Sequence, residues 1–292
     1  MLSAYLKSNR RAVDSALKTY LPPASTKPGT IHQAMRYSIF AGGKRLRPIL
    51  CIAAAESCEG RMENALPAAC AVEMVHTYSL IHDDLPAMDN DDFRRGKPTN
   101  HKVYGEAVAI LAGDALLTLA FEVLAATRPT RRYSIADQIR ELARASGSRA
   151  LIAGQVADLE AEGKNITLAQ LRFIHGAKTA ALLTSSIRLG AISANASDSD
   201  LTALTIFAQN LGMAFQVIDD ILDVTQTSEK LGKSAGKDVT AQKATFPAVL
   251  GLEKARKEAH RLTEKSLAAL DPLGKRADRL RKLADHLLQR EY

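Results

Sequence analysis

The sequence predicts an all-α protein, in which orthogonal and antiparallel helices form one large bundle around a central apolar cavity. Hydrophobic residues make up 46% of the 292 residues and aromatic residues only 5%. Ala and Leu therefore supply most of the core, as they do where helices pack closely. No segment alternates apolar and polar residues as a half-buried strand does. No break shifts the composition, so we expect a single domain over residues 1–292.

Apolar residues recur with the period of a helix along most of the chain. Short breaks that contain Gly or Pro, such as those at Pro86 and Pro272, separate these segments. Thr167, with Gln170 three residues later, forms a capping box that marks a helix start, and Asp198 or Ser199 is expected to cap a later helix. The segments expected to be helical are 5–20, 30–40, 48–59, 66–84, 105–126, 134–162, 167–194, 199–225, 240–270 and 275–289.

The net charge of +7 indicates an anionic partner. A nucleic-acid-binding protein gathers Lys and Arg along one element and interleaves them with aromatic residues. Here the basic residues lie instead beside short acidic motifs, as at Arg94 and Arg95. We therefore expect small phosphorylated substrates and no nucleic acid.

The cysteines and the apolar segments indicate a reducing compartment. The three cysteines, Cys51, Cys58 and Cys70, fit neither a disulfide framework nor a metal-binding pair, and buried, reduced thiols are expected. Charged residues interrupt the N-terminal segment, so no signal peptide is expected. The apolar run 107–126 contains Asp114 and Glu122, which favours a buried bundle helix over a membrane span. We expect a cytoplasmic protein with no membrane association.

A first acidic motif, residues 83–92, contains five aspartates and directly follows an apolar helical run. Asp83 and Asp89 are six residues apart, about 240° around an ideal helix, and could not converge on one ion if the helix continued. Pro86 disfavours helix at Leu85, so the helix should end near Asp84 and the chain should turn back. By itself this motif could also be a solvated acidic turn.

A second acidic motif, Asp219, Asp220 and Asp223, lies inside the apolar run 211–224. Asp219 and Asp223 share a helix face, and two like charges on an apolar helix are unfavourable without a cation. Carboxylates without accompanying His or Cys suit Mg²⁺ and not zinc. A di-iron site would need two Glu-x-x-His pairs, and the chain has only Glu73 with His76.

Basic groups accompany both acidic motifs. Gly-rich basic segments let the backbone approach a ligand, and their cations can hold phosphate oxygens. These residues are Lys44 and Arg47 in the loop 42–48, Arg94 and Arg95 after the first motif, and Lys233, Lys237 and Lys243 after the second. Together they predict a cavity with two acidic walls, basic loops and an apolar floor, suited to a metal-bound diphosphate attached to a hydrocarbon.

The motifs resemble those of the polyprenyl synthetase family, and within it the bacterial farnesyl diphosphate synthases (geranyltranstransferases). The similar segments are GGKRLRP (42–48), HTYSLIHDDLPAMDNDDFRRGKPT (76–99), AILAGDALL (109–117), GQVADLEAEG (154–163), GAKTAALL (176–183) and FQVIDDILDVTQTSEKLGKSAGKD (215–238). The resemblance implies the isoprenoid synthase fold. It also implies a trans-prenyltransferase that condenses isopentenyl diphosphate with dimethylallyl or geranyl diphosphate and releases diphosphate.

The resemblance also implies roles for individual residues. Three Mg²⁺ ions would be held, in the presence of diphosphate, by Asp83, Asp84 and Asp89 on one wall and by Asp219, supported by Asp220 and Asp223, on the other. The allylic diphosphate would contact Arg94, Lys178, Lys233 and Lys243. Isopentenyl diphosphate would bind Lys44, Arg47, His76 and Arg95 without its own metal. Thr179 and Gln216 would face the developing carbocation. Ala180 stands where the family often has Gly.

Product length should depend on the depth of the apolar channel below the first motif. Tyr78, with its neighbour Ser79, is the candidate floor, about one and a half helical turns below Asp83. Together with Pro86 and Ala87, it resembles synthases of the C15 product, so we expect (2E,6E)-farnesyl diphosphate, with geranyl or geranylgeranyl diphosphate as alternatives.

Two other classes of protein are alternatives. A terpene cyclase needs no second diphosphate pocket, which Lys44, Arg47 and Arg95 predict. A non-catalytic diphosphate-binding helical protein would not need acidic clusters on two walls. Many members of the family form homodimers, and the resemblance implies a homodimer here.

Overall fold

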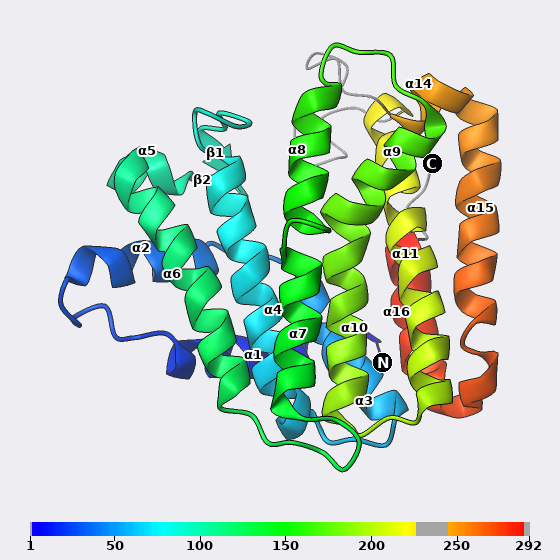
Figure 1. The fold of residues 1–292 in the computed structure, drawn as a ribbon, viewed down its shortest axis with the longest axis horizontal. Coiled ribbons are helices and arrows are strands. Elements are labelled where there is room, and N and C mark those ends of the chain that lie inside the picture. The colour runs from blue at the N-terminus through cyan, green and yellow to red at the C-terminus, as the bar shows by residue number, and fades with distance from the viewer. Residues whose placement is uncertain (1, 226–244, 289–292) are drawn as a thin grey trace.

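The computed structural model describes residues 2–225 and 245–288, and these are almost entirely helical (Figure 1). The elements are α1 (Leu2–Tyr20), α2 (Gly29–Ile39), α3 (Leu46–Ser57), α4 (Met62–Asp83), β1 (Phe93–Arg94), β2 (Lys97–Pro98), α5 (Asn100–Tyr104), α6 (Glu106–Ala125), α7 (Ile135–Ser146), α8 (Leu151–Ala161), α9 (Leu168–His175), η1 (Gly176–Ala180), α10 (Ala181–Ser193), α11 (Asp198–Thr225), α14 (Phe246–Leu250), α15 (Leu252–Ala268), η2 (Asp271–Ala277) and α16 (Asp278–Leu288). The predicted all-α fold is confirmed.

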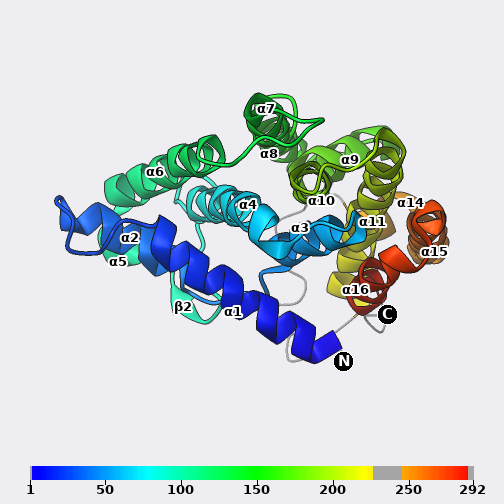
Figure 2. The ribbon, with the colours of Figure 1, turned by 90° about the horizontal axis from the view of Figure 1, so that it is seen from below.

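The longer helices run along one direction, and two N-terminal helices run across them. In Figure 1 the axes of α4, α6, α10, α11 and α15 are roughly aligned, whereas α1 and α2 cross this direction, as Figure 2 shows from below. Helices α4, α8 and α11 all end at the upper end of the bundle in Figure 1. The C-terminal ends of the helices that carry the two acidic motifs therefore lie at the same end of the molecule.

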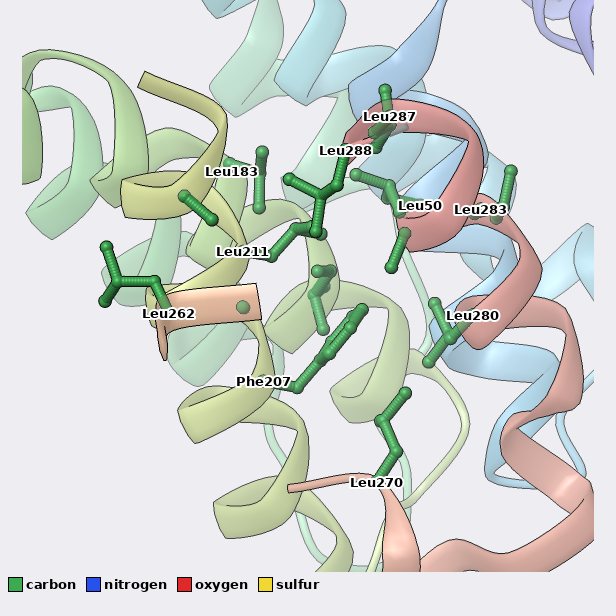
Figure 3. Close-up of a cluster of buried hydrophobic side chains, with 14 of the residues drawn as sticks. Leu50, Leu183, Phe207, Leu211, Leu262, Leu270, Leu280, Leu283, Leu287 and Leu288 are labelled. Atoms are coloured by element: carbon green, nitrogen blue, oxygen red, sulfur yellow. The ribbon is translucent and has the colours of Figure 1, made fainter. Parts of the chain in front are cut away.

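Two apolar clusters hold the bundle together. One surrounds α11, where Phe207 and Leu211 pack against Leu50 of α3 and leucines of α16 (Figure 3). The other surrounds α4 and α6 and includes Leu116. Truncating a fully buried leucine in such a cluster costs about 2–5 kcal/mol. These clusters fix the axes of α4 and α11, and so the frame on which the polar side chains are placed.

Several predicted helices are broken by local backbone geometry. The segment 134–162 divides into α7 and α8 at Gly147, and 240–270 divides at Gly251, whose φ of 80° no regular helix accommodates. The capping box at Thr167 is confirmed. The expected cap at Asp198 or Ser199 is wrong, because the Ser197 hydroxyl accepts the amide hydrogen bond of Asp200 instead.

The remaining differences are small. A two-residue antiparallel pair, β1 with β2, forms around Gly96 where no strand was expected. The three cysteines carry free thiols, and Cys51 and Cys70 are buried, as predicted. By length and composition alone, α6 and α11 could span a membrane. In the most apolar 18-residue stretch of each helix, 39% of the residues of α6 and 50% of those of α11 are buried.

Candidate active site

The first acidic motif folds into a tight turn at the end of α4. The helix ends at Asp83, and the amide of Asp89 donates to the Asp83 carbonyl at 2.8 Å. The amide of Asn90 donates to the carbonyl of Leu85 at 3.1 Å. The chain therefore turns back at Pro86, as predicted, and brings the backbone of Asp89 to the end of the helix.

The two aspartates at this helix end lie in different electrostatic surroundings. Burial, reinforced by the charge of Asp89, raises the pKa of Asp83 to about 6, although Lys178 opposes the shift. Asp84 is only 3% exposed, and its carboxylate accepts two bonds from Nε of Arg94, at 2.7 and 2.9 Å. Burial still raises the pKa of Asp84 despite this partner. Asp84 and Arg94, which we assigned separately to metal and diphosphate, are thus paired with each other.

A path of polar contacts leads from the first acidic motif to α11. On α8, the Gln155 amide donates to the Asp83 carboxylate. One turn further along α8, Asp158 accepts a 2.6 Å bond from the Lys178 ammonium group of η1.

The path then crosses from η1 to α11. The Thr179 hydroxyl donates to Oε1 of Gln216 at 3.2 Å. Asp219 lies three residues after Gln216, about one turn nearer the end of α11. The structure thus joins the two acidic motifs through α8 and η1. The sequence alone predicts no role for Gln155 or Asp158, although both lie in the segment 154–163 that resembles a family motif.

Lys178 and Thr179 lie on a π-helical segment, η1, inside what the sequence predicts as a continuous helix. Such segments insert one extra residue into a turn and are frequent at functional sites. Close packing accompanies this segment: a Cβ on Gly154 would lie 2.3 Å from the Lys178 amide nitrogen, and one on Gly212 would lie 2.7 Å from Cβ of Ala180. Glycines on α8 and α11 therefore let both helices contact the backbone of η1.

Two aspartates of the second acidic motif, Asp220 and Asp223, differ in their contacts. Asp220 is buried and accepts the amide hydrogen bond of Phe246 at 2.8 Å, while its Oδ2 lies 3.1 Å from Nε2 of His175. The His175 ring stacks on the Phe246 ring. Asp220 therefore joins α11 to α9 and α14, a role that we did not predict. Asp223 is 4% exposed, and its Oδ2 has no hydrogen-bond partner among the described residues.

The basic loop 42–48 lies against the middle of α4 and against Arg95. Nη1 of Arg47 lies 3.4 Å from Nε2 of His76, and Arg95 donates to the Gly42 carbonyl. Burial and the charges of Arg47 and Arg95 hold the pKa of His76 well below its usual range, so a neutral imidazole accepts from Arg47. Lys44 is exposed in the same loop. The four residues assigned to isopentenyl diphosphate are therefore gathered in one region.

The carboxylates of the two acidic motifs can supply part of a magnesium coordination shell, and a bound diphosphate would be needed to complete it. Within residues 2–225 and 245–288, no three Asp, Glu, His or Cys side chains converge closely enough to hold a metal by themselves. Mg²⁺ usually keeps one or two carboxylates and completes its shell with water and phosphate oxygens. Mutually repelling carboxylates at Asp83 and Asp89, and the unpaired oxygen of Asp223, match that requirement. Glu73 pairs with Arg45 and is not part of a di-iron pair.

Two further sets of predicted residues remain. Tyr78 is 6% exposed and contacts the His82 ring edge-to-face at 5.6 Å, while His82 contacts the Ile110 carbonyl of α6. The Ser79 hydroxyl donates to the His76 carbonyl, which ties it to its own helix. Lys233, Lys237 and Lys243 lie outside the described residues.

Comparison with known proteins identifies the family. The polyprenyl synthetase family matches residues 28–279. The chain is 50% identical over 293 residues to a dimethylallyltranstransferase of Fischerella ambigua, covering 100% of this chain and 84% of that one. It is 48% identical over 291 residues to a geranylgeranyl diphosphate synthase of Cyanophora paradoxa, covering 99% and 96%.

Solved structures give the same answer. The fold matches a crystal structure of an FPP/GFPP synthase from Zymomonas mobilis with a TM-score of 0.85 and 36% identity, covering 98% of both chains. The family match covers most of the chain, and the helical fold agrees with that of this solved structure. The chain belongs to the polyprenyl synthetase family and is a trans-prenyltransferase.

Proposed function

We propose that the protein condenses isopentenyl diphosphate with dimethylallyl diphosphate and then with geranyl diphosphate, and forms (2E,6E)-farnesyl diphosphate. The arrangement of α4 supports this most directly. His76, which contacts Arg47, and Asp83, which contacts Gln155, are seven residues apart on one face of the helix. Their separation along the axis is about 10 Å. Two diphosphates bound at these two positions would hold their hydrocarbon parts side by side.

The residues around the acidic motifs can assist ionisation of the allylic substrate. Magnesium, held by Asp83, Asp89, Asp219 and Asp223, would supply positive charge that offsets the charge growing on the departing diphosphate. Lys178 and Arg94 would donate hydrogen bonds to the oxygens of the departing diphosphate. Lys178 would first have to break its contact with Asp158. The Thr179 hydroxyl and the Gln216 amide would direct their oxygen dipoles at the allylic cation.

Coupling then requires no protein nucleophile. After the C–O bond has broken, the double bond of isopentenyl diphosphate, held by Lys44, Arg47, His76 and Arg95, attacks the allylic cation. The attack leaves a positive charge on C3 of the isopentenyl unit. A proton then leaves the adjacent carbon C2, the C2–C3 double bond forms, and the released diphosphate accepts the proton. The buried apolar lining around Tyr78 excludes water, which would otherwise trap the cation as an alcohol.

A C15 product is supported by the position of Tyr78. Its ring is buried in the apolar cluster that surrounds α4 and α6, about one and a half turns below Asp83, where a growing chain would meet it. Geranylgeranyl diphosphate is the second candidate, because relatives similar over their whole length, such as the Cyanophora paradoxa protein, carry that name.

One incubation tests both candidates. The protein is given isopentenyl diphosphate, dimethylallyl diphosphate and Mg²⁺, and the dephosphorylated products are separated by carbon number. A predominant C15 alcohol is expected, and omission of Mg²⁺ should abolish it. A predominant C20 alcohol would favour the second candidate, and the absence of any elongated product would contradict the proposed function.

We also propose that the protein is a homodimer that pairs through α6 and α8. Large apolar side chains stand exposed on both helices: Ile110 and Leu111 are 44% and 57% exposed on α6, and Ile152, Val156 and Leu159 are 40–49% exposed on α8. On α8 the exposed side chains recur at intervals of four and three residues, on one helix face, and exposed apolar surface of this kind marks contact sites. A second copy of the same surface would cover it through an interface with two-fold symmetry.

A further inference from the structure

Arg45 lies between Lys44 and Arg47, which our proposed function assigns to isopentenyl diphosphate, yet its own side chain points into the protein. It is 3% exposed, and its guanidinium group makes three contacts. Nε donates to Asp14 of α1 at 2.8 Å, Nη1 to Glu73 of α4 at 2.9 Å, and Nη2 to the Ile39 carbonyl at the end of α2 at 2.6 Å. Because the side chain is buried and each of its three nitrogens donates to a protein acceptor, Arg45 is not available to a ligand.

The backbone of Arg45 adopts a conformation that few residues with a side chain adopt. Its φ of 53° and ψ of 37° lie in the left-handed region, immediately before α3 begins at Leu46. Such a conformation persists where surrounding contacts over-determine it. Here the three contacts of the guanidinium group supply that constraint. They fix the point at which the loop 42–48 turns into α3, between Lys44 and Arg47.

Glu73, the partner of Arg45, also acts on the neighbouring arginines. It is 2% exposed and lies one turn before His76 on α4. Burial lowers the pKa values of Arg47 and Arg95, and the negative charge of Glu73 opposes that shift in both. One buried carboxylate therefore bonds to Arg45 and offsets the charges of two guanidinium groups that face the predicted isopentenyl diphosphate region.

We propose that Arg45 and Glu73 are positioning residues for the isopentenyl diphosphate half of the site. Arg45 fixes the loop so that Lys44 and Arg47 project toward the ligand, and Glu73 holds the Arg45 guanidinium group in place through their 2.9 Å contact. Neither residue touches a substrate. The inference rests on the proposed function, because it requires Lys44, Arg47 and Arg95 to bind isopentenyl diphosphate.

The test is Arg45→Lys, which keeps the positive charge but removes the planar fork that serves three acceptors at once. The KM for isopentenyl diphosphate should rise about tenfold because the loop is displaced, while the KM for the allylic substrate should stay within about twofold. A residue with a merely structural role would lower the active fraction and leave both KM values unchanged. Equal changes in the two KM values, or no change in either, would overturn the inference.

Two further variants keep the test decisive. If Arg45→Lys does not fold, Asp14→Ala removes only one of the three contacts, on a side chain that is 29% exposed. It should raise the KM for isopentenyl diphosphate about threefold, a smaller displacement in the same direction, and the absence of such a rise overturns the inference.

The matched control is Asp200→Asn, which breaks the 3.1 Å ion pair with Arg276 at the start of α11, the opposite end of the bundle. It should change neither KM, and a change there equal to that of Arg45→Lys would overturn the inference. A wild-type protein that consumes no isopentenyl diphosphate contradicts the proposed function and this inference with it. An active wild type without the KM split in Arg45→Lys contradicts the inference alone.

Discussion

At the scale of single residues, the site keeps its charged groups in contacts that a substrate could replace. Lys178 is held by Asp158, and Arg94 by Asp84. Asp83 is a buried carboxylate whose charged form is disfavoured by burial and by Asp89. A protein gains no stability from such a carboxylate, so the position is explained better by binding than by folding.

Replacing Asp83 with Ala should therefore separate activity from stability. We expect kcat to fall by about 10²–10⁴-fold, because charge stabilisation of the departing diphosphate is lost. The same loss is expected for Asp219→Ala. The free energy of unfolding, measured by urea denaturation, should be unchanged or slightly higher for Asp83→Ala.

Asp92→Ala is the matched control for these variants. Asp92 belongs to the same acidic motif but pairs with Lys102 at the surface, and its replacement should leave kcat within about twofold, as for surface substitutions generally. Near-wild-type turnover by Asp83→Ala would remove that residue from the site.

At the scale of elements, the contact between α8 and η1 decides where Lys178 lies. Gly154→Ala would place a methyl group 2.3 Å from the Lys178 amide nitrogen, so the two elements must separate. We expect a loss of about 1–3 kcal/mol in the free energy of unfolding together with a lower kcat. Thermal unfolding and steady-state kinetics measure the two effects.

Gly176→Ala is the matched control, because it adds the same methyl group at a position with space for it. A Cβ on Gly176, at the start of η1, would meet only the Met213 sulfur at 4.0 Å. Its unfolding free energy and kcat should match the wild type. If Gly154→Ala were equally neutral, the close approach of α8 would not be what positions Lys178.

The packing of α4 against α6 is expected to affect the length of the product. Tyr78→Ala opens space beside α6, below the first acidic motif, and should shift the product distribution from C15 to longer chains. Chromatography of the dephosphorylated products measures this shift. Tyr133 precedes α7, and its hydroxyl donates to the Ala196 carbonyl. The control variant Tyr133→Ala should leave the product distribution unchanged. A C15 product from Tyr78→Ala would clear Tyr78 of the floor role.

At the scale of the whole molecule, the exposed apolar side chains of α6 and α8 predict a second copy. Leu111→Glu should give a monomer, because a buried, unpaired carboxylate opposes the interface. Sedimentation velocity distinguishes a 31.5 kDa chain from twice that mass. Ile206→Glu alters an apolar side chain of similar exposure on α11, away from α6 in Figure 2, and should leave the dimer intact. A wild-type monomer would contradict the homodimer.

The sequence by itself determined the features that depend on neighbours along the chain. Helical periodicity gave the all-α fold, Thr167 with Gln170 gave a capping box, and Pro86 gave the turn after Asp83. Each rests on contacts within a few residues, so the local pattern was sufficient. The same local patterns identified both acidic motifs and the basic loop, and the resemblance to a known family implied the roles of their residues.

Only the tertiary structure decided which side chains meet. Gln155 contacts Asp83 from 72 positions away, Thr179 contacts Gln216 from 37, and Arg45 contacts Glu73 from 28. Nothing in the spacing of such residues encodes their approach. It follows from the way the apolar faces of separate helices pack, and from glycines that let two backbones come close. For the same reason, the π-helical turn at Lys178 could not be read from a continuous helical pattern.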